Sequence, residues 1–337
     1  MNRCQWGSML GFLLFGAIAL TGCQPKDGPR VVVYTALDPV FSRTIFEKFE
    51  SETGIRVDAV FDTEATKTTG LVERVRREKD RPRCDVFWNN EVLRTVRLAN
   101  DGVLEPYVSP SASAIPDHFK ARSGLWTGFA ARARVVAYDP ARIESAEAPQ
   151  RHADLLEDRW KGKIAIADPR FGTTGSHLAC LYALWGEAEY RRFLEGLAGN
   201  GAQVVGGNSV SRDRVLSGEV LLGLTDTDDV EVVRQRDASI AESYFPAEGT
   251  IVLPNTVAMV RGGPNPEFAR KFIDFVLSEA IEAELAASKS RQIPVRASVA
   301  VPESGLRLAD VPQLDVSFAE AAEHLPTAIR IAVEILR

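Results

Sequence analysis

Three aspartates lie within four residues in the segment 224–229, which has the sequence LTDTDD. The segment begins as the end of an apolar strand, so the carboxylates of Asp226, Asp228 and Asp229 are expected at the carboxyl end of that strand. Acids this close repel one another unless a cation lies among them or water solvates them. Carboxylate oxygens are hard ligands that suit Fe³⁺, Mn²⁺ or Ca²⁺, and they also suit an ammonium group. The alternative is that Asp228 and Asp229 only occupy the first turn of a following helix, where acids suit the dipole.

A second segment, 171–177 with the sequence FGTTGSH, is rich in small residues and hydroxyls and precedes a helix. Exposed amides and the dipole at such a helix start attract carbonate, phosphate or phosphonate. The expected anion-binding residues are Thr173, Thr174, Gly175 and Ser176, with Asn208 as a further donor. The GxxxxGK[ST] spacing of a phosphate-binding loop is absent, so nucleotide hydrolysis is not indicated. The alternative is a helix that is simply well capped.

Two arginines belong to an expected strand and add a positive component. Arg132 and Arg134 are two residues apart, so both side chains should point to the same side of the strand. Arg132 is therefore included among the anion-binding candidates. Whether that side faces the cleft is left open by the pattern.

The elements that would position these residues alternate between strand and helix. Strands are expected at 30–34, 55–61 and 85–88, and helices at 38–53, 68–78 and 91–101. Short connections in such an alternation imply an α/β fold with a mainly parallel, helix-covered sheet. Ligands of these sheets bind beyond the carboxyl ends of the strands.

The pattern repeats after an extended stretch at 126–138. Strands are expected at 163–166 and 220–225, helices at 174–185, 187–197 and 209–217, and a return crossing at 250–260. We therefore predict two lobes joined by a hinge. The first would comprise 30–132 plus 250–305, and the second 133–249 plus 306–337.

The N-terminus has the features of a targeting segment. Arg3 is the only charged residue before Lys26, and 9–20 is apolar apart from glycines, which is the length of a signal-peptide core. The stretch ends in the sequence LTGC at 20–23, which resembles a bacterial lipobox. We expect 1–22 to be a lipoprotein signal peptide, Cys23 to be lipidated and 23–29 to be a tether. The alternatives are an uncleaved membrane anchor or a buried helix.

Composition excludes several classes of protein. The chain has 337 residues, with 40 Lys and Arg against 46 Asp and Glu and a net charge of −6, and no basic block is present. Nucleic acid is therefore not expected as a ligand. The four cysteines lack CxxC spacing, which argues against a disulfide framework or a zinc ribbon, and Cys84 and Cys180 are expected to be buried thiols.

Several motifs together resemble the bacterial ferric-ion-binding periplasmic proteins, over about residues 30–295. They are the sequences FESETGIRV at 49–57, DVFW at 85–88, RARVV at 132–136, WKGKI at 160–164 and NSV at 208–210. The resemblance implies the two-lobed periplasmic binding protein fold of type II. It also implies a solute receptor that hands its cargo to an ABC permease.

The same resemblance suggests which residues would contact the cargo. Family members hold Fe³⁺ with a histidine, a glutamate and two adjacent tyrosines, together with a small anion. In this chain Asp38 occupies the histidine position, Asn90 the glutamate position with Glu91 next to it, and Asp228 and Asp229 the positions of the two tyrosines. Both phenolates are therefore replaced by carboxylates.

The leading hypothesis is a lipid-anchored receptor of an ABC importer, in the periplasm or at the cell surface, for iron or another hard metal ion. Carbonate or phosphate would accompany the metal, and the receptor would be a monomer without a catalytic cofactor. The alternative cargo is an aminoalkylphosphonate or a polyamine. The rival from another class is a secreted hydrolase that uses Asp228 and Asp229, but adjacent residues on an extended segment point to opposite faces, which is poor geometry for a carboxylate pair.

Overall fold

The computed structural model describes residues 28–37, 39–62, 69–236 and 239–337. Its strands form a continuous sheet in the order β2-β1-β3-β10-β5-β8-β6-β7, with β4 beside β10 and β9 beside β5. The strands are β1 (Arg30–Thr35), β2 (Arg56–Phe61), β3 (Val86–Asn89), β4 (Leu104–Glu105), β5 (Thr127–Tyr138), β6 (Ile164–Ala167), β7 (Gln203–Val205), β8 (Leu222–Asp226), β9 (Ala241–Ser243) and β10 (Val252–Val260).

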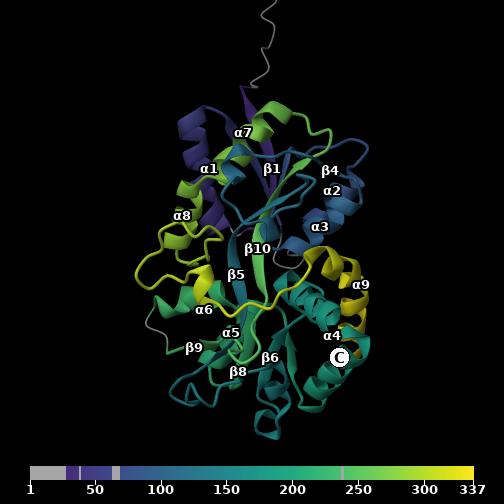
Figure 1. The fold of residues 1–337 in the computed structure, drawn as a ribbon, viewed down its shortest axis with the longest axis vertical. Helices are drawn as coiled ribbons and strands as arrows, with labels where there is room; N and C mark the ends of the chain where they lie inside the picture. Colours follow the sequence, from purple (N-terminus) through teal and green to yellow (C-terminus); the bar gives the residue numbers. More distant parts are fainter. Residues whose placement is uncertain (1–27, 38, 63–68, 237–238) are drawn as a thin grey trace, which may run out of the picture.

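The strand β5 divides the sheet into two halves. Its residues 127–133 pair with β10, whereas residues 134–138 pair with β8, both in the antiparallel sense. We call the half with β1–β4 and β10 lobe 1, and the half with β6–β9 lobe 2. Figure 1 shows the two lobes stacked along the long axis, with β5 and β10 running between them. The two-lobed α/β prediction is confirmed, while the exact residue boundaries of the lobes stay a prediction.

Helices cover the sheet in both lobes. The helices of lobe 1 are α1 (Pro39–Thr53), α2 (Gly70–Arg77), α3 (Val92–Asn100), α7 (Pro266–Val276) and α8 (Glu279–Ala287). Those of lobe 2 are α4 (Gly172–Gly199), α5 (Asn208–Leu216) and α6 (Thr227–Arg234), and α9 (Phe318–Ile335) packs against both α4 and α3. Short 3-10 helices lie at Pro110–Ala112, Asp117–Phe119, His152–Leu156, Asp158–Trp160 and Leu308–Asp310.

Local sequence explains where the elements begin and end. Pro39 opens α1, where its missing amide has no helical partner, and Gly54 ends the helix at a φ of 68°. Phe46 and Phe49 on the inner face of α1 pack against Phe272 of α7, with ring centroids 5.9 and 5.2 Å apart. Gly186 takes a φ of 74° and divides α4 into the two helical parts expected from the sequence.

The parallel strands of each lobe end at the same boundary. The loops after β1 and β3 in lobe 1, and those after β6, β7 and β8 in lobe 2, follow the carboxyl ends of parallel neighbours. This places the residues that follow these strands where a ligand is expected in such folds.

Candidate functional site

A cavity of about 110 Å³ lies between the lobes. Lobe 1 contributes Leu37, Phe41 and Asn90, so its wall is apolar apart from one amide. Lobe 2 contributes a polar wall: Ala167, Asp168, Phe171, Gly172, Thr173, Gly206, Gly207, Asn208, Ser209, Asp226, Asp228 and Asp229. Arg132 of β5 completes the lining at the point where the two lobes join. The three clustered aspartates therefore line one enclosed space.

The predicted aspartate cluster has the geometry of a potential cation site. One carboxylate oxygen each of Asp226, Asp228 and Asp229 lies within 4.8 Å of the other two. Asp226 ends β8, and Asp228 and Asp229 lie in the first turn of α6. The acids thus occupy a helix start and also line the cavity, while their role in binding a cation stays a prediction.

Asp226 is the most deeply placed of the three and is bound by a network. Arg134 forms a 2.6 Å ion pair with Asp226, and the exposed fractions of the two side chains are 1% and 5%. Thr173 donates to Asp226 Oδ2 at 2.5 Å, and Asn208 donates to the same oxygen at 2.8 Å. Arg134 Nη2 also donates to Thr174 Oγ1 at 3.4 Å. Both carboxylate oxygens of Asp226 already accept hydrogen bonds from neighbouring side chains. Asp226 therefore has a structural role at the base of the cavity.

The other two aspartates are more accessible than Asp226. Asp228 is 21% exposed and pairs with Arg132 Nε at 3.0 Å. Asp229 is 22% exposed and forms an ion pair with Arg212 at 3.7 Å. Arg212 also pairs with Asp213 at 2.6 Å, so its charge is shared. Of these three ion pairs, the one between Arg212 and Asp229 is the longest.

Arg132 connects the lobes at the back of the cavity. It donates to the backbone oxygen of Asn90, which follows β3, and to Asn255 Oδ1 of β10 at 3.1 Å. Its third contact is the ion pair with Asp228 on α6. The two arginines predicted to share one side of the strand both approach the aspartates, Arg132 at the cavity wall and Arg134 beneath it.

The remaining metal-ligand candidates lie in different environments. Asp38 lies outside the described residues. Asn90 lines the cavity, and its buried Oδ1 has no hydrogen-bond partner in the described parts of the chain. Glu91 is fully buried and caps α3 by accepting from the amides of Leu93 and Arg94 at 2.9 and 3.1 Å. Glu91 does not line the cavity.

The anion-binding candidates are also divided by the fold. Thr173 and Asn208 line the cavity, whereas Thr174, Gly175 and Ser176 do not. Gly175 packs closely, since a Cβ there would lie 2.5 Å from the backbone oxygen of Pro169. Ser176 donates to Glu91 instead, at 2.5 Å.

Several cavity residues were not predicted from the sequence. They are Leu37, Phe41, Asp168, Phe171, Gly206, Gly207 and Ser209. Leu37 follows β1, Asp168 follows β6 and Gly206 follows β7. Leu37 and Asp168 follow strands that the sequence predicts, so the rule that ligands bind beyond strand carboxyl ends points to them. The sequence predicts no strand at 203–205, so no such signal points to Gly206.

A buried histidine pair lies behind the anion-binding segment. His152 and His177 meet at 3.1 Å between their Nε2 atoms, and His152 Nδ1 lies 3.2 Å from Glu248. His152 also stacks on Phe245 with ring centroids 3.9 Å apart. Burial lowers the pKa of His177 well below 6.5, and the charges of Arg134 and His152 lower it further.

We expect His177 to make the stability of the protein depend on pH. The pKa of His177 is depressed in the folded state. The stability that the neutral side chain contributes is therefore complete above about pH 6.5 and is lost as the pH falls toward the folded pKa. The free energy of unfolding should fall by up to about 1.4 kcal/mol per pH unit in that window. Urea unfolding at pH 7, 6 and 5 checks this. The change of the free energy of unfolding with pH should be smaller in His177→Gln and unchanged in the exposed control His118→Gln. An equal change in the wild type and both variants would contradict the role of His177.

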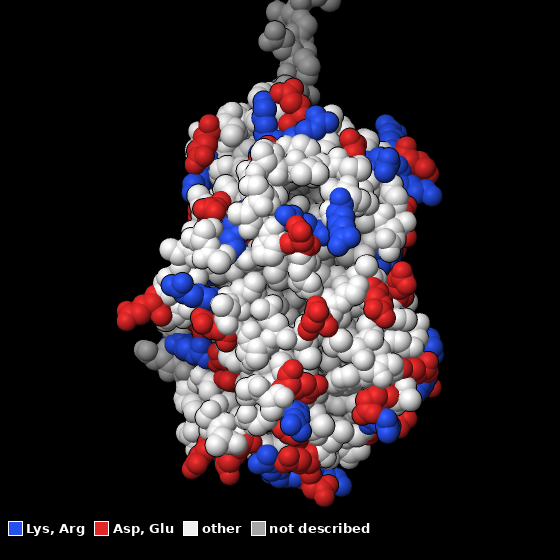
Figure 2. All heavy atoms as spheres, viewed as in Figure 1, with Lys and Arg blue, Asp and Glu red and all other residues white. Residues whose placement is uncertain are grey.

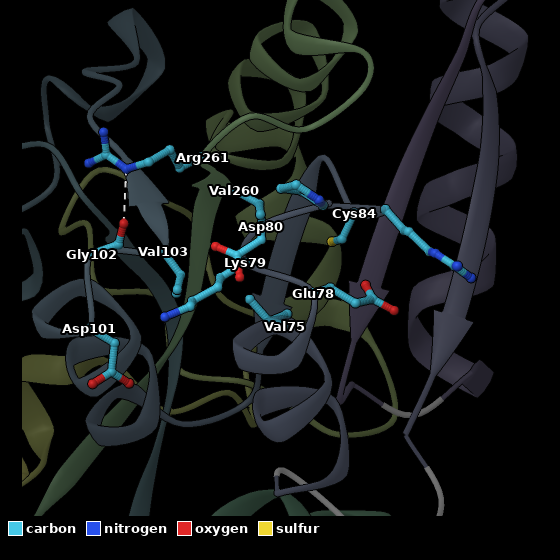
Figure 3. Close-up of a pocket in the computed structure, with 12 residues that line it drawn as sticks. Val75, Glu78, Lys79, Asp80, Cys84, Asp101, Gly102, Val103, Val260 and Arg261 are labelled. Carbon is cyan, nitrogen blue, oxygen red and sulfur yellow. Dashed lines mark hydrogen bonds between the residues drawn. The ribbon is translucent and has the colours of Figure 1, made fainter.

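A second pocket of about 210 Å³ lies in lobe 1, away from the cavity. Figure 3 shows Glu78, Lys79, Asp80 and Arg261 around it, with Arg261 donating to Gly102 O at 2.9 Å. It lies on the side where β3 begins, whereas the cavity lies where β3 ends. Cys84 in its wall is a free, buried thiol, as is Cys180 in α4, which agrees with the prediction for both.

The surface charges of one face are mixed. Figure 2 shows lysines and arginines interspersed with aspartates and glutamates over both lobes. This face has no broad single-sign patch of the kind that nucleic acid requires. Among the described helices, none combines the length and apolar character needed to cross a membrane.

Comparisons with known proteins agree with the geometry. Residues 94–318 match the family model described as "Bacterial extracellular solute-binding protein". "Iron uptake protein A1" of Synechocystis sp. is 29% identical over 83% of this chain and 79% of its own length. The "Putative 2-aminoethylphosphonate-binding periplasmic protein" of Salmonella typhimurium is 24% identical over 75% of this chain and 74% of its own.

A solved structure shares the fold. The iron-bound HitA from Pseudomonas aeruginosa superimposes with a TM-score of 0.82 at 22% identity, covering 90% of this chain and 99% of that one. At this identity the likeness concerns the arrangement of the lobes, and it extends over nearly the whole of the solved chain.

Proposed function

Because the chain belongs to the bacterial extracellular solute-binding protein family, we propose that it is the receptor that captures a small charged cargo for an ABC importer. The observation that carries this proposal is the cavity between the lobes, lined from lobe 2 by the carboxylates of Asp226, Asp228 and Asp229. The lobes would close on the cargo and present it to the permease subunits. The relatives named for iron uptake and for 2-aminoethylphosphonate binding support this role rather than catalysis.

The cargo that we favour is a hard metal ion, ferric iron in the first place, together with an anion. Asp228 and Asp229 are exposed enough to be reached, and carboxylates are suitable ligands for Fe³⁺, Mn²⁺ and Ca²⁺. The iron uptake relative supports iron among these ions. Among the described residues that line the cavity, none offers the soft or imidazole ligands that copper and zinc favour.

An anion is needed because arginines already neutralise part of the negative charge of the aspartates. Arg134 and Arg132 neutralise Asp226 and Asp228, so a bare trivalent ion would bring excess positive charge into a small cavity. An accompanying carbonate, phosphate or citrate removes that excess. Its oxygens would be received by Arg132, Asn208 and the start of α5, where helix amides and the dipole favour negative charge.

An aminoalkylphosphonate is the second candidate cargo. The cavity offers both signs of charge and an apolar wall formed by Leu37 and Phe41, which suits a short carbon chain with an ammonium group and a phosphonate. The 2-aminoethylphosphonate relative supports this possibility. A polyamine fits less well, because Arg132, Arg134 and Arg212 would repel its ammonium groups.

Isothermal titration separates these candidates. The purified protein would be titrated with Fe³⁺-citrate, citrate alone, Mn²⁺, Ca²⁺ and 2-aminoethylphosphonate. We expect binding of Fe³⁺-citrate that citrate alone does not reproduce. Binding heat with 2-aminoethylphosphonate alone would make this organic zwitterion the cargo in place of a metal ion. No binding heat with any of the five ligands would contradict the proposed cargo classes.

The anchor and location form part of the same proposal. Cys23 would carry the lipid and tether the receptor at the outer face of a membrane, in the periplasm or at the cell surface, as a monomer. Cys23 lies outside the described residues, and the support comes from its position after the apolar segment 9–20.

A further inference from the structure

Arg94 of α3 is buried and crosses the boundary between the lobes. Only 5% of its surface is exposed. Its Nη1 donates to the backbone oxygen of Gly172 at 3.2 Å, and its Nη2 donates to that of Arg170 at 3.0 Å. Both acceptors belong to the turn that connects β6 to α4 in lobe 2. In Figure 1, α3 lies directly above α4, where the lobes meet.

Glu91 makes a second contact across the same boundary. Ser176, in the first turns of α4, donates its hydroxyl to Glu91 Oε2 at 2.5 Å. The same carboxylate caps α3 and lies 3.6 Å from Arg94 Nη1. Glu91 and Arg94 therefore neutralise each other while each also binds lobe 2.

These contacts hold a segment that forms the wall of the cavity. The turn that accepts from Arg94 includes Asp168, Phe171 and Gly172, which line the cavity. Hydrogen bonds of a charged group belong to the strong class, and separating the lobes would replace all three contacts with contacts to water. Closure and the shape of the cavity are thus stabilised by the same interactions.

We propose that Glu91 and Arg94 form a latch that holds the lobes closed and thereby sets the affinity for cargo. The two residues act through the position of lobe 2 rather than through contact with cargo. The statement about affinity rests on the proposed receptor function, whereas the closed arrangement can be measured without any cargo.

Two variants test the latch from opposite lobes. Arg94→Gln removes both backbone contacts, and Ser176→Ala removes the hydroxyl contact while leaving the cap of α3 intact. Arg76→Gln is the matched control, because Arg76 pairs with Glu73 and Asp101 inside lobe 1. Circular dichroism and thermal unfolding would establish that each variant is folded, and Ser176→Ala keeps the test available if Arg94→Gln does not fold.

The first readout uses the cargo-free protein. Small-angle scattering should give a larger radius of gyration for both latch variants, and amide exchange in 168–176 should become about tenfold faster, as expected for the loss of one charge-assisted hydrogen bond. The second readout is titration with Fe³⁺-citrate and 2-aminoethylphosphonate. Affinity for whichever binds should fall about tenfold, mainly through faster dissociation.

The outcomes separate this inference from the proposed function. Scattering and exchange identical to the wild type in both latch variants would overturn the latch, whatever the protein binds. If the wild-type protein binds neither probe, the proposed cargo classes fail, while the cargo-free measurements still decide the latch. An equal effect in Arg76→Gln would also overturn it, because the change would then reflect general loosening of lobe 1.

Discussion

Replacing Asp228 and Asp229 together by asparagine is expected to weaken the binding of Fe³⁺-citrate by at least about 100-fold. Asparagine keeps the volume of each side chain but removes the negative charges that would ligate the metal. Of the two single variants, Asp229→Asn is the cleaner, because the ion pair of Asp229 with Arg212 is long, at 3.7 Å, whereas Asp228→Asn removes the 3.0 Å ion pair with Arg132. Isothermal titration of the three variants measures the effect.

Asp168→Asn is the matched control for this experiment. Asp168 lines the same cavity, but its carboxylate is held by Arg170 at 2.5 Å. The same chemical change there should therefore alter the affinity by no more than about threefold, in keeping with an ion pair near the surface. Equal losses at Asp168 and at the Asp228–Asp229 pair would show that general negative potential, and not ligation by the cluster, binds the cargo.

Asp226→Asn should destabilise the protein by about 3–5 kcal/mol. Arg134 is 1% exposed and 2.6 Å from Asp226, so this substitution leaves a buried cation without its counter-charge. Thr173 and Asn208 also lose a charged acceptor. Urea unfolding measures the change, and Lys48→Gln serves as the control, because its pair with Glu284 is about a third exposed on both sides and should matter much less.

A double variant tests the physical reason for this loss. Arg134→Met combined with Asp226→Leu removes both charges and refills the space, so its cost should be well below the sum of the two single substitutions. Additive losses would mean that the two side chains stabilise the protein independently. They would contradict the assignment of the pair as one buried unit.

Much of the fold follows from local patterns. The β-branched run after residue 29 specifies a strand. Pro39 specifies the start of α1, and Gly54 specifies its end. Each of these features depends on the backbone preferences of a few neighbouring residues. The aspartate cluster was predicted in the same way, because it lies at the carboxyl end of a strand. The two-lobed fold was predicted from the alternation of these elements, and the observed strand order confirms it.

The partners of the site residues could be decided only by tertiary structure. Arg134 and Asp226 are 92 positions apart in the sequence. They contact each other because β5 pairs with β8 in an antiparallel register. Glu91 was predicted as a metal ligand from the family resemblance, whereas the approach of α4 supplies Ser176 as its partner.

His152 and His177, which have no metal-ligand spacing in the sequence, are adjacent in space for the same reason. Local preferences act over a few residues, and strand order and lobe packing act over the whole chain. The amino-acid sequence by itself therefore determined the elements and the acidic cluster, whereas the folded arrangement determined which charges face one another and which side chains line the cavity.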